Sequence, residues 1–326
     1  MREIRIERND AGQRLDRFLR KYLGKASLSR IYSAIRKDVK VNGSRVREDY
    51  KLAEGDTVAL YMTDGEIDSF VQTKKRGTAK RQFSVIYEDE DLIIVSKPFG
   101  LLVHGDSSEK KDTLANQVVD YLIEKGDYVP RLEKSFTPSP VHRLDRNTTG
   151  LVVFGKNAEA LRELTAMFRE DGKVIKTYNT IVAGELTEPL MLQDRLVKDE
   201  ANNRVRVVPL DSPEGKYIET IVRPVGGDRR YTIVEVDLIT GRSHQIRAHL
   251  SHAGYPLIGD PKYGDRKVNA SVYKVAGLST QLLHAGEITF IDPGERLAGL
   301  KDKSFTDPLP PSWDAIQTEL FGRKFI

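Results

Sequence analysis

Cysteine is absent from this chain of 326 residues. The protein therefore has no disulfide, no thiolate metal site and no cysteine nucleophile. Long apolar segments are absent as well, and runs such as residues 92–95 are far too short to span a bilayer. The first residues lack the apolar stretch of a secretory signal. These absences favour a cytoplasmic protein with no membrane partner.

The composition is that of a globular protein whose positive charge is concentrated near the N-terminus. Hydrophobic residues make up 39% of the chain and charged residues 31%. The net charge is only +4, but residues 11–47 contain eleven Lys or Arg side chains and two Asp. Such an excess in one small segment is typical of a nucleic-acid-binding surface. The alternative is a solvated basic face without a partner.

Hydrophobic spacing in the same segment predicts two short helices followed by strands. The first helix carries apolar residues at helical spacing, namely Leu15, Phe18, Leu19, Tyr22 and Leu23. Ser27 or Ser29 caps the second helix, which continues through Ile35. An Asn-Gly turn at residues 42–43 and a strand over residues 57–61 complete a small α+β module.

From Phe83 onward the pattern is mostly that of strands. Strands are predicted over residues 85–87, 92–95, 151–154, 174–182, 204–208, 218–222, 231–238 and 287–291, and helices over 114–123, 158–168 and 244–252. Many strands in uneven runs, with fewer segregated helices, predict an α+β fold with a mixed or antiparallel sheet. Residues 301–326 are expected to form a C-terminal tail, anchored on the body by Trp313 and Phe321.

The ten residues 142–151, His-Arg-Leu-Asp-Arg-Asn-Thr-Thr-Gly-Leu, carry the densest chemistry in the chain. Asp145 lies between Arg143 and Arg146, and nearby positive charge keeps a carboxylate ionised. An ionised Asp suits a nucleophile or an anionic anchor better than a general acid. The competing interpretation is an Asp–Arg pair that only closes a surface loop.

This string resembles the HRLD-x-x-T-[ST]-G signature of the RluA family of pseudouridine synthases. Further stretches resemble the family's other blocks in the same order: residues 97–104, Lys176-Thr177-Tyr178, and residues 240–250 followed by 259–264. The resemblance covers roughly residues 83–295. The N-terminal module is similar to an S4 RNA-binding domain, and an S4 domain joined to this catalytic domain most resembles the RluC/RluD type, which acts on large-subunit ribosomal RNA.

The resemblance implies a cofactor-free isomerisation of uridine in RNA, with the target base flipped out of its stack. Asp145 matches the nucleophile, Tyr178 the flat ring that holds the uracil, and Arg247 the cation that fixes the carboxylate. Arg143 matches the residue that enters the RNA where the base has left. The expected RNA-contacting residues are Arg143, His142 and Arg242 in the catalytic domain and Arg30, Arg36 and Lys37 in the N-terminal module. Whether Asp145 attacks the base or the ribose stays open.

Three other functions compete with this one. His244, His249 and His252 invite a metal site, but no HExxH pattern or carboxylate pair completes it. The segment from His142 to Asp145 echoes a kinase catalytic loop, but Leu144 intervenes and no Asp-Phe-Gly or glycine-rich phosphate loop is present. A non-catalytic RNA-binding or ribosome-assembly factor that retains the fold is the remaining alternative.

The sequence thus predicts an α+β enzyme in which a small S4-like α+β domain precedes a catalytic domain with a mixed or antiparallel sheet. We expect the S4-like domain over residues 12–72, a linker over 73–82, the catalytic domain over 83–300 and the tail over 301–326. The expected partner is ribosomal RNA, and no metal or other cofactor is expected. The protein is expected to act as a monomer.

Overall fold

The computed structural model describes residues 1–71, 80–106, 109, 111–130, 134–199 and 204–326. The chain divides into two compact units, each described by itself. Unit 1 comprises residues 1–81, 116–139 and 155–162, and unit 2 comprises residues 82–115, 140–154 and 163–326. Of the linker expected over residues 73–82, residues 73–79 lie outside the described residues.

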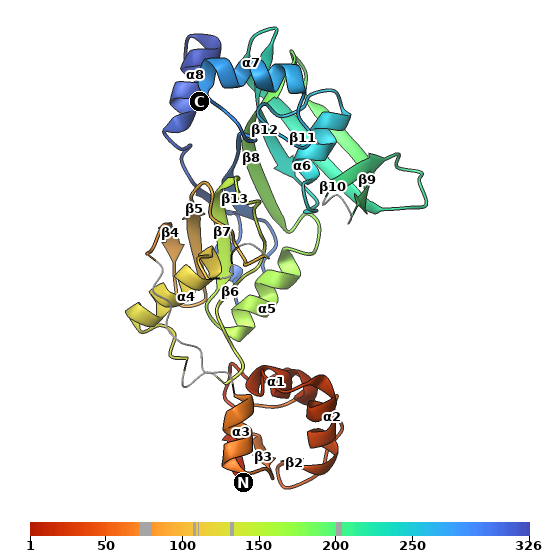
Figure 1. Cartoon of the computed structure of the whole chain (residues 1–326), viewed down its shortest axis with the longest axis vertical. Helices are drawn as coiled ribbons and strands as arrows, with labels where there is room; N and C mark the ends of the chain where they lie inside the picture. The colour runs from red at the N-terminus through yellow and green to blue at the C-terminus, as the bar shows by residue number, and fades with distance from the viewer. Residues whose placement is uncertain (72–79, 107–108, 110, 131–133, 200–203) are drawn as a thin grey trace. The chain divides into compact units, whose positions relative to one another are not determined.

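Unit 1 is built around a three-stranded antiparallel sheet with the strand order β1-β3-β2 (Figure 1). Its N-terminal elements are β1 (Arg2–Arg5), α1 (Leu15–Tyr22), α2 (Leu28–Lys37), β2 (Val39–Val41), β3 (Thr57–Leu60) and α3 (Asp64–Phe70). The predicted apolar stripe is confirmed, because Leu15, Phe18 and Leu19 are fully buried. Ser27 caps α2 by accepting a hydrogen bond from the backbone N–H of Arg30 at 3.2 Å.

The expected start of the S4-like domain at residue 12 is too late. Strand β1 pairs with β3 from Arg2 to Arg5, and the apolar core of this part includes Ile4 and Ile6. Without β1, one edge of β3 would lose its backbone partner. The module therefore begins at the first strand.

Unit 2 contains one large mixed sheet with the strand order β10-β9-β11-β12-β8-β13-β7-β5-β4. Strand β7 pairs with β13 in parallel, whereas β8 to β12 pair with their neighbours antiparallel. This confirms the predicted α+β class. The strands are β4 (Ser84–Glu88), β5 (Leu92–Lys97), β6 (Ser139–Pro140), β7 (Thr149–Gly155), β8 (Val174–Ala183), β9 (Leu190–Asp199), β10 (Arg204–Val208), β11 (Lys216–Gly227), β12 (Tyr231–Leu238), β13 (Leu283–Phe290) and β14 (Lys303–Thr306).

The remaining helices are α4 (Leu114–Lys125), α5 (Ala158–Met167), α6 (Gln245–His252), α7 (Arg266–Ala276) and α8 (Ser312–Phe321), with a short 3-10 helix at Ala298–Leu300. Helix α6 packs against β10 and β11, and α7 packs against α8 (Figure 1). Among the described residues, no helix is both long and apolar enough to cross a membrane.

Residues 301–326 are an integral part of unit 2 rather than a tail. Strand β14 pairs with β13, and α8 contributes Trp313, Ile316 and Leu320 to a buried cluster that also includes Ile233 of the large sheet. The apolar residues of α8 are thus buried against the sheet, which is why this segment is folded. The expected anchoring by Trp313 agrees with its 2% exposure.

Gly150 stands where β7 meets β13, and both its conformation and its surroundings require glycine. Its φ is +113°, and a Cβ atom would lie 2.3 Å from the carbonyl oxygen of Ala285. The close approach of the two backbones fixes the end of the segment that carries Asp145.

Gly150→Ala should therefore destabilise the protein by about 3 kcal/mol or more, because strain and a backbone clash add together. Gly254→Ala is the matched control: Gly254 also has a positive φ (+87°), but a Cβ atom there would meet nothing within 4 Å. The control should cost about 1 kcal/mol. Denaturant unfolding of both variants measures the difference, and equal stabilities would contradict the packing argument.

Candidate active site

Asp145 is held on a loop whose backbone is tied to the end of β5. Lys97, the last residue of β5, is fully buried, and its Nζ donates to the carbonyl oxygens of Pro98, Leu101 and Arg146 at 2.8 to 3.0 Å. The backbone N–H of Gly100 also donates to the Arg146 carbonyl, at 3.1 Å. These contacts fix the peptide between Arg146 and Asn147, directly after Asp145 and its neighbour.

Burial lowers the pKa of Lys97 to about 7, although the Asp145 carboxylate acts in the opposite direction. The three carbonyl acceptors match the three N–H groups of an ammonium. Lys97 therefore serves as a support for the Asp145 loop, with no N–H donor left for a substrate contact.

Arg247 of α6 links two carboxylates. Its Nε and Nη2 donate to the two oxygens of Asp260 at 2.7 and 2.8 Å, which forms a bidentate pair. Its Nη1 donates to Oδ2 of Asp145 at 2.8 Å. Asp260 is fully buried and Arg247 is 5% exposed, whereas the Asp145 side chain is 29% exposed. Asp260 thus fixes the guanidinium in the interior, and the guanidinium donates one N–H to Asp145, which is the more exposed of the two carboxylates.

In this group, Arg247 and Asp260 each stabilise the charged form of the other. Burial by itself would raise the pKa of Asp260, but the hydrogen bonds from Arg247 and from the backbone N–H groups of Lys262 and Tyr263 outweigh it and lower that pKa below its usual value. Burial likewise opposes the charge of Arg247, yet its bonds to Asp260 and Asp145 raise its pKa. Both groups are therefore charged at neutral pH.

Tyr178 lies in the middle of β8 and is 6% exposed. Burial, and secondarily the negative charge of Asp145, raises the pKa of its phenol well above the usual range. The ring is therefore neutral at any physiological pH. A neutral, flat ring near the Asp145 carboxylate provides a surface for stacking rather than a proton acceptor.

His244 is a further side chain beside Asp145. It precedes α6 in the left-handed conformation with φ 53°, its Nδ1 lies 3.0 Å from the Tyr263 hydroxyl, and its Nε2 lies 3.9 Å from Oδ2 of Asp145. The Tyr263 hydroxyl also accepts the backbone N–H of Val205 at 2.9 Å. Burial lowers the pKa of His244 even though Asp145 favours its protonated form.

The structure brings together some of the expected site residues and separates others. Asp145 and Arg247 are hydrogen-bonded, and Arg143 is exposed on the same loop as Asp145. His142 faces inward: it accepts the backbone N–H of Val153 at 3.2 Å and stacks on Phe168 at 4.8 Å. Burial lowers its pKa to about 3, so its ring is neutral. These partners give His142 a supporting role in the loop, and its expected RNA contact stays a prediction.

Arg30 also differs from the expectation of a cation available to RNA. In unit 1 its guanidinium donates to Glu66 at 2.6 Å and to Asp38 at 3.1 Å. Arg36 and Lys37, the other two residues expected to contact RNA, are exposed at the end of α2. The sequence does not indicate that Glu66 pairs with Arg30, because the two residues are 36 positions apart.

Asp260, His244 and Lys97 were missed as members of the site. All three lie inside the motifs that pointed to the family, at residues 97–104, 240–250 and 259–264. The signal available in the sequence was an ionisable residue inside a family motif. Only the structure shows that Lys97 and Asp260 are buried and therefore need several acceptors or a partner of opposite charge. Among the residues that the structure describes, no three His, Cys, Asp or Glu side chains are grouped to hold a metal ion.

Residues 91–252 match the RNA pseudouridylate synthase family. The Ribosomal large subunit pseudouridine synthase C of Vibrio vulnificus (strain CMCP6) is 37% identical over 295 residues, covering 89% of this chain and 88% of that protein. The protein of the same name from Escherichia coli (strain K12) is 34% identical, with 89% of each chain covered.

Solved structures agree on the fold. Human RNA Pseudouridylate Synthase Domain Containing 4 superimposes with a TM-score of 0.58 at 22% identity, over 72% of this chain and 92% of that one. Human RNA Pseudouridylate Synthase Domain Containing 1 gives 0.56 at 20% identity, over 72% and 87%. The chain belongs to the RNA pseudouridylate synthase family. It is a pseudouridine synthase, an isomerase, as its motifs predicted.

Asp260→Asn should destabilise the protein by about 3 kcal/mol at pH 7, because it removes the bidentate partner of a buried guanidinium. The folded Asp260 carboxyl has a lower pKa than the unfolded one. Its stabilising contribution is therefore complete above the unfolded value of about 3.9 and is lost as the pH falls through the folded value. The stability gap between wild type and variant should accordingly narrow below about pH 4.

Asp314→Asn is the control, because Asp314 pairs with Lys324 at the surface and its side chain is 49% exposed. Such a pair contributes little, so this variant should unfold like the wild type at every pH. Denaturant unfolding between pH 3 and 8 compares the three proteins. A gap for Asp260→Asn that is independent of pH would contradict the assigned charge state.

Proposed function

We propose that this pseudouridine synthase modifies large-subunit ribosomal RNA and that Asp145 is its nucleophile. The observation that carries the assignment is the Arg247 N–H bonded to Asp145, with Arg247 itself locked by Asp260. A carboxylate fixed in this way is oriented and still 29% exposed, as a nucleophile must be. The names of the curated relatives supply the RNA class.

In the proposed reaction the bond between the uracil N1 and the ribose C1′ breaks. The uracil turns, its C5 joins C1′, the proton on C5 is released to solvent and N1 takes up a proton, so that the product is an isomer of the substrate. The base must first leave the RNA stack, since its reacting atoms are otherwise shielded. Asp145 forms the transient covalent bond, either with the base or with the ribose, and no metal or cofactor is required.

The neighbouring residues have distinct proposed roles. Tyr178 stacks on the extruded uracil, and its raised pKa keeps the ring uncharged while it does so. Arg247 orients Asp145. Arg143, exposed two residues before Asp145, enters the RNA at the position that the base has left. Arg242 contacts the RNA backbone close to the site.

We propose that the N-terminal module is an S4-like RNA-binding domain that supplies phosphate contacts. The exposed Arg36 and Lys37 are assigned this role ahead of Arg30, whose charge is balanced by Glu66 and Asp38. Action in the cytoplasm and as a monomer remain predictions. A non-catalytic assembly factor would not need an accessible carboxylate held by a buried arginine, so we favour the enzyme.

Asp145→Asn should reduce the release of tritium from a transcript of large-subunit ribosomal RNA labelled at uridine C5 by at least about a thousandfold. The substitution keeps the shape of the side chain and removes the charge of the nucleophile. Asp292→Asn, at a 69% exposed carboxylate, is the matched control and should retain full activity. Mapping pseudouridines in the same transcript identifies the target. A fully active Asp145→Asn enzyme, or no pseudouridine formed by the wild type, would contradict the proposal.

The double variant Arg36→Gln/Lys37→Gln should bind the same transcript more weakly and with a shallower salt dependence. Each lost phosphate contact should reduce the slope of log affinity against log salt by about 0.7 on single-stranded RNA. Lys274→Gln, an exposed lysine in the last turn of α7, is the control and should keep the wild-type slope. If the double variant also kept that slope, the N-terminal helices would not supply these contacts.

A further inference from the structure

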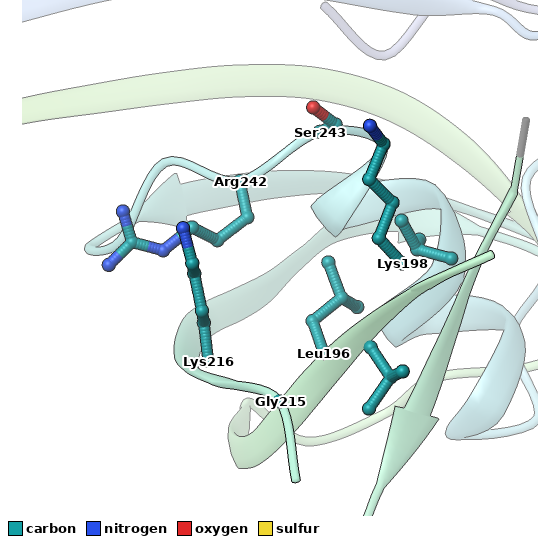
Figure 2. A pocket seen from close by; sticks show the side chains of 8 residues that line it. Leu196, Lys198, Gly215, Lys216, Arg242 and Ser243 are labelled. Atoms are coloured by element: carbon teal, nitrogen blue, oxygen red, sulfur yellow. The ribbon is translucent and has the colours of Figure 1, made fainter. Parts of the chain in front are cut away.

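A pocket of about 490 Å³ opens in unit 2 between strands β9 and β10, the start of β11 and the loop that precedes α6. Its walls are formed by eight residues: Leu196, Val197, Lys198, Val205, Gly215, Lys216, Arg242 and Ser243. Figure 2 shows the Lys216 side chain extending toward Arg242 and the Lys198 side chain extending toward Ser243, with Leu196 between them. The volume is within the range of small-molecule sites.

The lining of this pocket has two chemical characters. Leu196 and Val205 are buried members of an apolar cluster and provide a hydrophobic wall. Three of the eight lining residues are cations, Lys198, Lys216 and Arg242, and none is acidic. A hydrophobic wall beside several cations and no carboxylate matches a nucleotide, which has a flat base and a negatively charged phosphate.

Arg242 contains an unsatisfied donor. Its Nε is buried, and among the residues that the structure describes no acceptor lies within hydrogen-bond range of it. A buried charged donor without an acceptor is costly, so such groups commonly mark a ligand position. Phosphate oxygens are suitable acceptors for a guanidinium.

The backbone beneath Arg242 is held rigidly. The side-chain oxygen of Gln245 accepts the backbone N–H of Arg242 and the hydroxyl of Thr240, both at 3.0 Å. The side-chain nitrogen of Gln245 donates to the carbonyl of Glu219 at 3.0 Å and to the Thr220 hydroxyl at 3.1 Å. The guanidinium is therefore presented by a loop that is already ordered, which reduces the entropic cost of binding.

Two residues that line the pocket are next to an active-site residue in the chain. Arg242 and Ser243 immediately precede His244, whose Nε2 lies 3.9 Å from Asp145. The Tyr263 hydroxyl links Val205, on the apolar wall of the pocket, to His244, because it accepts the backbone N–H of Val205 and contacts the His244 ring. A ligand in the pocket would thus be close to the RNA strand that supplies the target uridine.

We propose that this pocket binds a second nucleotide of the RNA substrate, one that flanks the target uridine. Its phosphate is held by Arg242 and Lys216, and its base packs against Leu196 and Val205. The inference rests on the proposed function and adds to it a specificity subsite: the enzyme selects RNA loops in which a neighbouring nucleotide is also unstacked. Single-stranded loops offer such bases, whereas a regular RNA helix does not.

The first experiment measures binding of the full chain to the large-subunit ribosomal RNA transcript. Lys216→Gln should weaken binding roughly tenfold, since it removes a hydrogen bond to a charged group. It should also reduce the salt slope by about 0.7. Lys303→Gln, at an exposed lysine of β14 that does not line the pocket, is the matched control and should change neither quantity. Equal behaviour of the two variants would overturn the inference.

The second experiment identifies the occupant. A photoreactive benzoylphenylalanine at position 216 of the full chain is irradiated with the same transcript, and the crosslinked nucleotide is mapped. The expected crosslink lies within a few nucleotides of the uridine that the wild type converts. Crosslinks only at remote positions, or none, would overturn the subsite. If the wild type converts no uridine in this transcript, the proposed function fails instead, so the two failures are distinguishable.

Discussion

The site depends on one shared guanidinium. Arg247 gives two of its N–H groups to the fully buried Asp260 and a third to Asp145. The pair with Asp260 fixes the orientation of the guanidinium. Because of this, the remaining N–H points at Asp145, a partly exposed carboxylate on a different segment of the chain. The backbone N–H groups of Lys262 and Tyr263 complete the shell of Asp260. The buried charges are thus fully compensated, and the only one with access to solvent is the proposed nucleophile.

Three residues fix the position of the Asp145 loop. Lys97 holds the carbonyl of Arg146 from the end of β5, the His142 ring closes the loop against Phe168, and Gly150 allows β7 to approach Ala285. None of these contacts reaches a substrate. They hold the backbone of the loop, and this backbone places the Asp145 carboxylate within hydrogen-bond distance of Arg247. Preorganisation of this kind lowers the cost of orienting a reacting group.

Cations of the same type serve two purposes in this chain, and their partners decide which. Arg247 and Arg30 are bound by carboxylates and hold structure, whereas Arg36, Lys37 and Lys216 are exposed at the surface. Arg242 is intermediate, because its backbone is fixed while its Nε has no acceptor among the described residues. Net charge alone therefore says little about RNA binding. The presence or absence of a carboxylate partner, within each unit, distinguishes the cations that hold structure from those proposed to bind RNA.

The sequence by itself determined the family, the α+β class and most strands of the large sheet, because motif order and alternating apolar residues are local signals. It also supplied Asp145, Tyr178 and Arg247 by their motifs. It did not reveal β9, whose residues are largely half-exposed, or α7, whose residues are largely exposed, nor that residues 303–306 and 312–321 belong to the body. The resemblance already paired Arg247 with Asp145. Only the tertiary structure added Asp260 to that pair, bound Arg30 to Glu66 and Asp38 and turned His142 inward. Arg247 and Asp260 are 13 residues apart and Arg30 and Glu66 are 36 apart, and no local pattern encodes which such partners meet.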